Sequence, residues 1–208
     1  MARRALPEKE GITVDLSEAI HRRRSVREYR SDPVSREDIL KILDAASWAP
    51  SAMNLQNRSF IVVTGPVLAS MGKNFGNIIE GLTSNWPPSE KRGGMTREEF
   101  IRFAATYGGA PAAIMVLTDA HDRPNVRKAN LESACAAMEN ILLAATALGL
   151  GTCWMTGPLL DEKFLRTLLA IPDTKVIVAI TPLGYPMRIP EPPPRLDPGF
   201  KRSVQWVT

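Results

Sequence analysis

The chain has few of the side chains on which most catalytic triads and metal sites depend. Its 208 residues include two histidines, His21 and His121, and two cysteines, Cys135 and Cys153. There is no HExxH motif and no CxxC pair, so a histidine-based triad or a zinc site is hard to build. Reduced thiols fit the cysteines best, and we therefore expect a cytoplasmic protein.

Long hydrophobic runs are also missing. No apolar stretch reaches the ~18 residues that a membrane span requires, and residues 1–11 lack the apolar region of a secretory signal. We expect no membrane contact, and we interpret residues 1–14 as a loose leader. The net charge of +4 is modest, and the four tryptophans are scattered, which disfavours a nucleic-acid-binding protein. Phosphorylated ligands are compatible with this charge.

The remaining composition is typical of one globular domain, which we assign to residues 1–208. Hydrophobic residues make up 44% of the chain and charged residues 23%. Capping residues and apolar spacing predict helices over 16–24, 36–49, 67–74, 97 onward, 125–148 and 162–170. Apolar, β-branched runs predict strands over 59–64, 111–118, 152–155 and 175–183. Because helices precede the first strand and the two types do not alternate strictly, we predict an α+β fold, a mixed sheet with helices on both faces.

Five segments carry further expectations. Strand 59–64 should be buried, and helix 36–49 should bury a stripe made of Ile39, Leu40, Ile42, Leu43 and Ala46. Helix 125–148 is apolar nearly all round, which places it at the centre of the domain or of a subunit interface. The weakly patterned stretch 65–109 is either a lid or binding loop or a mobile surface excursion. Segment 185–208, with six prolines between 186 and 198, should run extended.

A cluster of fixed positive charge lies where the first predicted helix ends. Arg23, Arg24 and Arg27 surround Ser25. Arginine offers a planar fork of donors that suits phosphate and other flat anions. Taken alone, this run is more simply a solvated basic helix end. It is followed, however, by a turn of small and amide side chains that contains Pro50, Ser51, Ala52, Met53, Asn54 and Gln56.

Together these two segments resemble the flavin-dependent nitroreductase family, whose chains carry an RRSxR element followed by an APSxxNxQ element. The later stretches resemble this family too, so the likeness covers nearly the whole chain. It implies a mainly antiparallel sheet, FMN as the cofactor, and NADH or NADPH as the electron donor. After Gln56 the usual Pro-Trp is replaced by Asn57 and Arg58, which bears on ring-edge contacts and substrate preference rather than on the fold.

The resemblance assigns roles to the arginine cluster. Arg23 and Ser25 would lie toward the phosphate and ribityl chain of FMN, and Arg27 toward the pyrimidine edge of the ring. Arg24 would contribute mostly through its backbone. A cation at the pyrimidine edge stabilises the negative charge of the reduced ring, which is how such a residue tunes the flavin potential.

Two loops complete the site that the resemblance implies. Loop 50–54 would reach the flavin of the partner subunit, and the amides of Asn54 and Gln56 would bond its ribityl hydroxyls and ring edge. Segment 149–154 begins like a dinucleotide fingerprint, but it lacks the last glycine and follows a helix instead of a strand. By resemblance, Met155, Thr156 and Gly157 of the overlapping segment 151–158 belong to the site, with Thr156 or Gly157 offering a backbone N–H to flavin N5.

The tail supplies the last expected contact. Gly184, Tyr185 and Pro186 resemble the end of the family's last strand, beyond which an arginine or lysine closes on the phosphate. Arg195 is the best match, and Lys201 and Arg202 compete with it. We assign no catalytic side chain, because a flavin carries the chemistry itself. The candidates for the pocket wall are Trp86, Phe103 and Tyr107.

The expected function is an FMN-dependent oxidoreductase. It would pass electrons from NAD(P)H to a nitroaromatic, quinone or similar small-molecule acceptor by a ping-pong mechanism. The alternatives are a flavin-binding module without turnover, and a dehalogenase or flavin-cleaving enzyme on the same fold. The apolar helix and the resemblance imply a homodimer with shared flavin sites, in which the tail 185–208 reaches the partner subunit.

Overall fold

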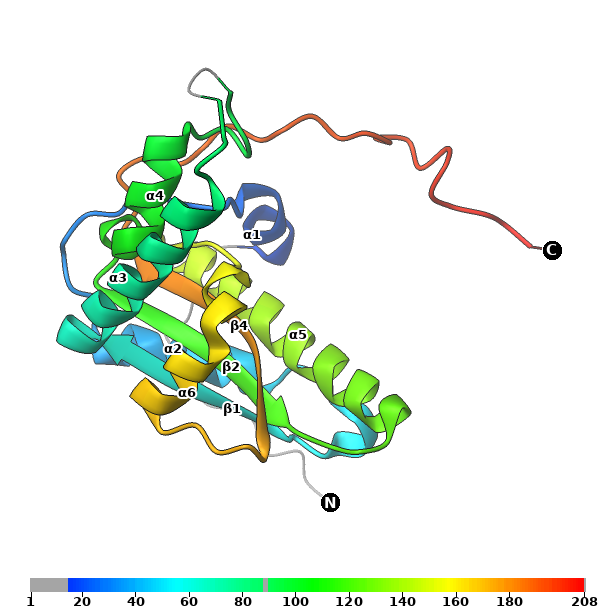
Figure 1. The fold of residues 1–208 in the computed structure, drawn as a ribbon. Helices are drawn as coiled ribbons and strands as arrows, with labels where there is room; N and C mark the ends of the chain where they lie inside the picture. Colours follow the sequence, from blue (N-terminus) through cyan, green and yellow to red (C-terminus); the bar gives the residue numbers. More distant parts are fainter. Residues whose placement is uncertain (1–14, 88–89, 208) are drawn as a thin grey trace.

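The fold is built around a four-stranded sheet with the order β1-β2-β4-β3 (Figure 1). The computed structural model describes residues 15–87 and 90–207, so the predicted leader 1–14 lies outside the described residues. The strands are β1 (Arg58–Thr64), β2 (Ala112–Asp119), β3 (Gly151–Thr152) and β4 (Lys175–Gly184), and every neighbouring pair is antiparallel. A parallel bridge from Ser25 to Thr152 adds the mixed character. The predicted α+β fold with a mainly antiparallel sheet is confirmed.

The central strand β2 is buried on both faces, and its side chains alternate between two hydrophobic cores. Ala113, Met115 and Leu117 enter one core, whereas Ala112, Ile114 and Val116 enter the other. The register to β4 shifts between Val116 and Leu117. Such a bulge inserts one residue and re-aims its neighbours without breaking the pairing.

The first core lies under α3 (Gly65–Leu82), α4 (Arg97–Thr106) and α6 (Glu162–Leu169). The capping residues Thr96 and Asp161 are confirmed, and Thr96 forms a full capping box with Glu99. The predicted helix 67–74 is too short, because α3 continues through 18 residues. A Cβ on Gly72 or Gly76 would lie 2.3 Å or 2.7 Å from atoms of Ala105. These glycines therefore let α3 and α4 pack at very close range.

The second core lies under α2 (Arg36–Ser47) and α5 (Pro124–Ala147), with α1 (Leu16–Arg22) against α5. The expected central position of α5 is confirmed, since it contacts α1, α2 and all four strands. The buried stripe of α2 is narrower than predicted. Leu40 is 55% exposed, whereas Ile42 and Ala46 are fully buried. Leu40 therefore lies at the solvent side of the helix.

Strand β1 corrects a third expectation, because it is an edge strand and not a buried one. Only Val63 is buried among its seven residues, and Val62 is 38% exposed. An apolar, β-branched run predicts a strand well but does not say whether both of its edges and faces are covered.

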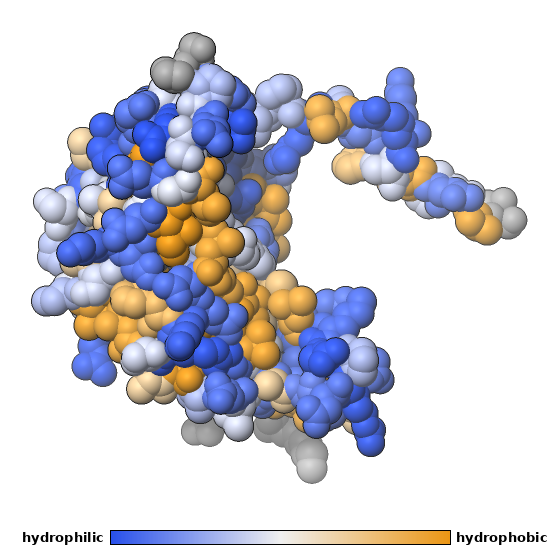
Figure 2. All heavy atoms as spheres, in the orientation of Figure 1, coloured by the Kyte–Doolittle hydropathy of each residue, from blue (hydrophilic) through white to orange (hydrophobic). Residues whose placement is uncertain are grey.

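Short connections and the tail complete the chain. The 3-10 turns are η1 (Ala52–Asn54), η2 (Tyr107–Gly109) and η3 (Gly157–Asp161). Beyond β4 the tail leaves the body as an extended segment, with a local turn around Asp197 (Figure 1). Figure 2 shows apolar side chains gathered on the concave side of the body that this tail overhangs. In the described part of the chain, no helix combines the length and apolar character needed to cross a membrane.

Candidate functional site

The arginine segment that follows α1 is held by parts of the chain far away in sequence. The N–H of Val26 donates to the carbonyl of Thr152 at 2.8 Å, and that of Tyr29 to the carbonyl of Gly108 at 2.9 Å. The N–H of Arg30 donates to Tyr185 at 2.8 Å. The Tyr29 hydroxyl turns back to the carbonyl of Val26 at 2.7 Å. The segment therefore has one fixed course along the end of the sheet.

Three glycines make room for this segment. A Cβ on Gly108 would lie 2.3 Å from the carbonyl oxygen of Arg27, and one on Gly151 would lie 2.8 Å from the Val26 side chain. A Cβ on Gly184 would meet the Tyr29 ring at 3.1 Å. Gly108 also has a φ of +70°, a region that side-chain-bearing residues avoid. The backbone approach that places Arg27 thus depends on these glycines.

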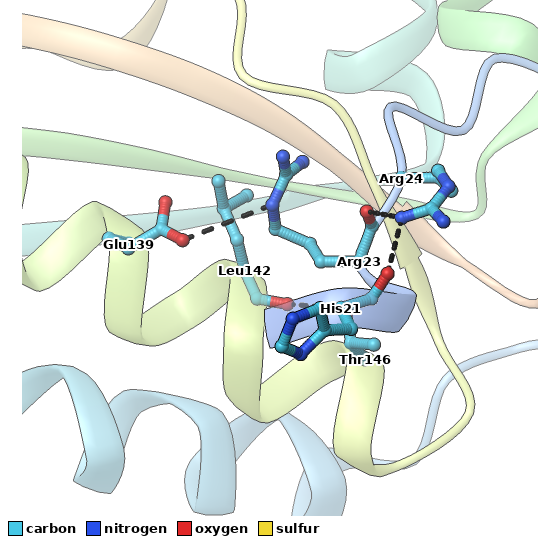
Figure 3. Close-up of polar contacts among 6 residues, drawn as sticks. All are labelled: His21, Arg23, Arg24, Glu139, Leu142 and Thr146. Carbon is cyan, nitrogen blue, oxygen red and sulfur yellow. Dashed lines mark hydrogen bonds and ion pairs between the residues drawn. The ribbon is translucent and has the colours of Figure 1, made fainter. Parts of the chain in front are cut away.

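Arg23 and Arg24 point in different directions from the start of the segment (Figure 3). The Nε of Arg23 lies 3.9 Å from Oε1 of Glu139 on α5. The Nη1 of Arg24 donates to the carbonyls of His21 and Arg23, both at 2.7 Å. The guanidinium of Arg24 is therefore engaged at the C-terminal end of α1, where cations offset the unpaired carbonyls.

Two adjoining cavities meet at Arg27. We call the first, of about 600 Å³, the aromatic cavity; its walls include Phe75, Trp86, Phe100, Phe103 and Trp154. We call the second, of about 910 Å³, the basic cavity; its cationic side chains besides Arg27 are Lys91, Arg102 and Arg188. Both cavities are lined by Arg27, Gly93, Met95 and Phe103. A ligand that is larger than either cavity can therefore extend across this boundary.

The aromatic cavity brings backbone donors together with Arg27. Met155, Thr156 and Gly157 line it, together with Cys153 and Trp154. Among the described residues, the N–H groups of Thr156 and Gly157 have no hydrogen-bond acceptor, as expected where the turn η3 begins. The cavity thus combines flat apolar walls, two available N–H donors and a guanidinium.

No acid–base or metal chemistry is built into these walls. Cys153 is buried, and burial raises the pKa of its thiol while the charge of Arg27 opposes this shift. The thiol is therefore protonated at neutral pH. Within the described residues, no group of three His, Cys, Asp or Glu side chains is arranged to hold a metal ion. The residues instead suit the binding and orientation of a flat, anionic molecule.

Comparison with known proteins shows to which family this chain belongs. The model of the nitroreductase family matches residues 20–185. The chain belongs to the nitroreductase family. A putative NADH dehydrogenase/NAD(P)H nitroreductase of Archaeoglobus fulgidus is 36% identical to it, over 80% of this chain and 83% of that one. A putative nitroreductase of Desulfovibrio desulfuricans, solved in complex with FMN, is 27% identical with a TM-score of 0.65, and the likeness covers 86% of this chain and 91% of that chain.

Other relatives that resemble this chain carry names of different activities. Iodotyrosine deiodinase 1 of Rattus norvegicus is 27% identical over 82% of this chain and 62% of its own length. The 5,6-dimethylbenzimidazole synthase of Rhodospirillum rubrum is 29% identical over 84% of this chain and 83% of its own. Similarity to known proteins therefore does not by itself name the acceptor.

Loop 50–56 lies outside both cavities of this nitroreductase-family chain. Met53, Asn54 and Gln56 all have positive φ angles of 50° to 54°, which is costly for residues other than glycine. The N–H of Ala52 donates to Ser133 on α5, and the amides of Asn54 and Gln56 bond each other. Met53 is 93% exposed. The loop is thus a strained, defined surface feature whose predicted role in a site requires a partner subunit.

The tail differs in detail from the sequence prediction. Arg195, Lys201 and Arg202 are exposed and line neither cavity. The tail lines the basic cavity with its residues 188–191. The cation among them is Arg188, whose Nε lies 3.2 Å from Oε2 of Glu28. Sequence reasoning did not single out Arg188, although it stands only two residues beyond Pro186.

The sequence also left most of the cavity walls unassigned. Trp86 and Phe103 line the aromatic cavity as predicted, whereas Tyr107 lies in the core with its ring 6.2 Å from that of Phe75. Lys91, Arg92 and Arg102 were missed. A signal for Arg102 was present, because Glu99, Arg102, Phe103 and Thr106 recur at the spacing of one helical face.

Proposed function

We propose that this protein is an FMN-dependent oxidoreductase that passes electrons from NADH or NADPH to a nitroaromatic, quinone or similar acceptor. The observation that carries the proposal is the convergence of Arg27 with the available N–H groups of Thr156 and Gly157 in an aromatic cavity. Membership of the nitroreductase family supports it.

These residues fit a flavin nucleotide by their chemistry. The isoalloxazine ring is flat and accepts hydrogen bonds along its edge, so the aromatic walls suit one of its faces and leave the other for a substrate. The N–H groups of Thr156 and Gly157 would bond its N5 side, and the Arg27 guanidinium its pyrimidine edge. When bound, the cofactor would supply hydride chemistry, while the protein contributes binding and orientation.

Arg23 and Ser25 would hold the phosphate and ribityl chain. Arg23 has one weak partner, Glu139 at 3.9 Å, in a half-exposed position, so its guanidinium is available for a stronger, charge-assisted bond to phosphate. Arg24 would contribute its backbone, because its side chain is engaged at the end of α1. In this proposal Arg195, Lys201 or Arg202 completes the phosphate site when the tail is docked.

One cavity would serve the donor and the acceptor in turn. The chain has no second nucleotide motif, and the two available backbone donors belong to neighbouring residues, Thr156 and Gly157, of one cavity. This arrangement predicts ping-pong kinetics, with parallel double-reciprocal lines for donor and acceptor. Intersecting lines would indicate that both substrates are bound together.

We also propose that the working form is a homodimer with shared sites. Loop 50–56 lies outside the cavities, exposes Met53 and keeps three costly backbone conformations. The tail ends in exposed apolar side chains, with Trp206 at 87%. Both features are explained if a partner chain covers them, with the loop of one subunit completing the flavin site of the other and the tail packing on its neighbour.

The test begins with the purified protein. We expect a yellow protein with about one non-covalent FMN per chain, identified by chromatography after acid release, and bleaching of the flavin absorbance when NADH or NADPH is added without oxygen. A colourless protein that takes up no added FMN would contradict the proposal. Retained colour without bleaching would favour a flavin-binding module.

The acceptor is tested separately with a panel under steady-state conditions. Nitroaromatics and quinones should reoxidise the flavin in multiple turnovers. Because relatives include an iodotyrosine deiodinase and a 5,6-dimethylbenzimidazole synthase, the panel also contains iodotyrosine, and flavin recovery is measured after exposure to oxygen. Release of iodide, or loss of flavin, in place of nitro and quinone reduction would reassign the reaction.

A further inference from the structure

The basic cavity adjoins the aromatic cavity and shares Ser25 and Arg27 with the proposed flavin site, but the flavin chemistry proposed above gives its other walls no role. Its walls come from the Gly93–Gly94 turn, α4, the turn η2 and the start of the tail. The two cavities share Arg27 and Phe103. The basic cavity is therefore open to the distal part of a molecule whose flat end occupies the aromatic cavity.

Three cations from three separate elements converge in this cavity. Lys91 comes from the turn before α4, Arg102 from α4 itself and Arg188 from the tail. All three line the same cavity as Glu99. The bond from the Thr96 backbone N–H lowers the pKa of the Glu99 carboxyl, and the charges of the three cations act in the same direction. Three positive charges in one cavity repel one another, which costs free energy. We therefore expect a negative charge to bind there.

The acidic residues of the cavity do not supply that counter-charge in full. Glu28 is already paired with Arg188, and Glu99 accepts the Thr96 N–H at 2.8 Å. Among the residues that the structure describes, Lys91 and Arg102 form no ion pair within 4.0 Å. The third acidic residue of the wall, Glu191, forms no ion pair among the described residues. Lys91 and Arg102 are therefore cations without a directly paired carboxylate at the mouth of the site.

We propose that the basic cavity binds the phosphates of the nicotinamide donor through Lys91 and Arg102, and thereby favours NADPH over NADH. This inference rests on the proposed function, since it assumes a dinucleotide whose nicotinamide ring lies in the aromatic cavity. The ring of such a donor is flat and its phosphates follow at a distance, which matches two joined cavities of these characters. NADPH carries one more phosphate, of charge −1.5 to −2, and gains most from additional cations.

The first experiment measures kcat/KM for NADPH and NADH in the flavin-loaded protein. Arg102→Gln and Lys91→Gln should each lower the value for NADPH about tenfold, mainly through KM, and the value for NADH much less. Arg36→Gln and Lys73→Gln remove the same charges from exposed positions outside the cavities and should change neither value. Equal effects on both donors, or none, would overturn the proposal.

Flavin binding is followed in the same variants. FMN affinity and thermal stability should be unchanged, because both side chains are exposed and neither belongs to the proposed flavin site. If Arg102→Gln lowers the affinity for FMN and leaves kcat/KM for NADPH unchanged, the cavity holds the phosphate of the flavin instead, and the proposal is wrong.

A second experiment does not depend on turnover. Adenosine 2′,5′-bisphosphate carries the two phosphates on the adenosine half of NADPH without its nicotinamide half, and calorimetry with the holoprotein should detect its binding. We expect binding to be lost in Arg102→Gln, retained in Arg36→Gln and weakened as salt is raised. If neither donor bleaches the flavin, the proposed function fails, but this titration still shows whether the basic cavity binds phosphates. If the bisphosphate does not bind to the wild type, the proposed phosphate site is wrong.

Discussion

At the scale of single residues, Arg27 is the charged side chain that lines both cavities. We expect Arg27→Ala to weaken FMN binding by ten- to a hundredfold, because a charge-assisted hydrogen bond contributes roughly 1.5–3 kcal/mol. Titration of the apoprotein with FMN measures the change. Arg22→Ala is the control, since Arg22 is an exposed arginine of α1 paired with Glu18. Equal FMN affinities of Arg27→Ala and Arg22→Ala would mean that Arg27 is an ordinary surface charge without a role in flavin binding.

Gly108 should be as important as Arg27, although it offers no side chain. A Cβ there would lie 2.3 Å from the Arg27 carbonyl oxygen, in a backbone conformation with φ of +70°. We expect Gly108→Ala to lower the free energy of unfolding by at least about 2 kcal/mol and to reduce flavin retention.

The matched control for Gly108 is Gly81→Ala. A Cβ on Gly81 would meet nothing within 4 Å, and this glycine lies in the helix α3. Alanine is the better helix former by up to ~1 kcal/mol, so this variant should be neutral or slightly more stable. Urea unfolding of the two variants gives the comparison, and a stable Gly108→Ala protein with full flavin would contradict the close approach.

At the scale of elements, the capping box of α4 predicts a pH-dependent stability. The Thr96 N–H and nearby cations lower the pKa of Glu99 below its ordinary 4.5 in the folded protein. A lowered pKa means that the charge stabilises the fold at neutral pH and that this contribution is lost as the pH falls below 4.5. Glutamine keeps the acceptor oxygen and removes the charge. Glu99→Gln should therefore be less stable than the wild type at pH 7 and nearly equal to it in acid.

Glu98→Gln provides the comparison for that measurement. Glu98 lies in the same first turn of α4, is exposed, and forms no side-chain hydrogen bond among the described residues. Both variants lose a charge at the helix N-terminus, so the difference between them isolates the capping box and its cationic neighbours. A pH dependence that is identical in the two variants would remove this special role from Glu99.

Local signals predicted some elements well and failed for others. Thr96, Asp161 and Ser35 begin helices because a side-chain oxygen can bond the first N–H groups, which is a local property. The length of α3 and the exposure of β1 depend on what packs against them. Gly72 and Gly76 weaken the helical pattern of α3, yet they are the positions where α4 approaches. A residue that lowers local propensity can thus mark a tertiary contact.

At the scale of the whole molecule, the tail should decide assembly. Its first residues are docked, because Met187 donates to Glu28 and Arg188 pairs with it. We therefore truncate the chain after Glu191, which keeps these contacts and removes the exposed remainder. The shared-site proposal predicts loss of both the dimer and bound FMN, measured by light scattering and flavin content.

Full-length Arg195→Gln separates the charge from the chain. If Arg195 meets the phosphate, this variant should lose FMN affinity and remain a dimer. If Lys201 or Arg202 does so, Arg195→Gln should behave as the wild type. A wild-type monomer that holds FMN tightly would contradict the shared site, whatever the tail variants show.

The site as a whole was only partly readable from the sequence. The arginine segment and Thr156–Gly157 stand in short motifs, and the structure does bring Arg27, Thr156 and Gly157 to one cavity. Lys91, Arg102 and Arg188 belong to no motif and gather only because α4 and the tail pass the same place. Loop 50–56 is the opposite case. Its motif is clear in the sequence, but the ligand contact predicted for it would be made in a partner subunit.

The long-range backbone hydrogen bonds of the arginine segment have a consequence for the folding of the protein during its synthesis on the ribosome. The backbone N–H groups of this segment, those of Val26, Tyr29 and Arg30, bond the carbonyls of Thr152, Gly108 and Tyr185. A segment that is synthesised early therefore reaches its final position only when almost all of the chain has emerged. Cofactor capture must then follow the completion of synthesis. Nascent chains stalled before β4 should not retain flavin, whereas released chains should acquire it without further maturation.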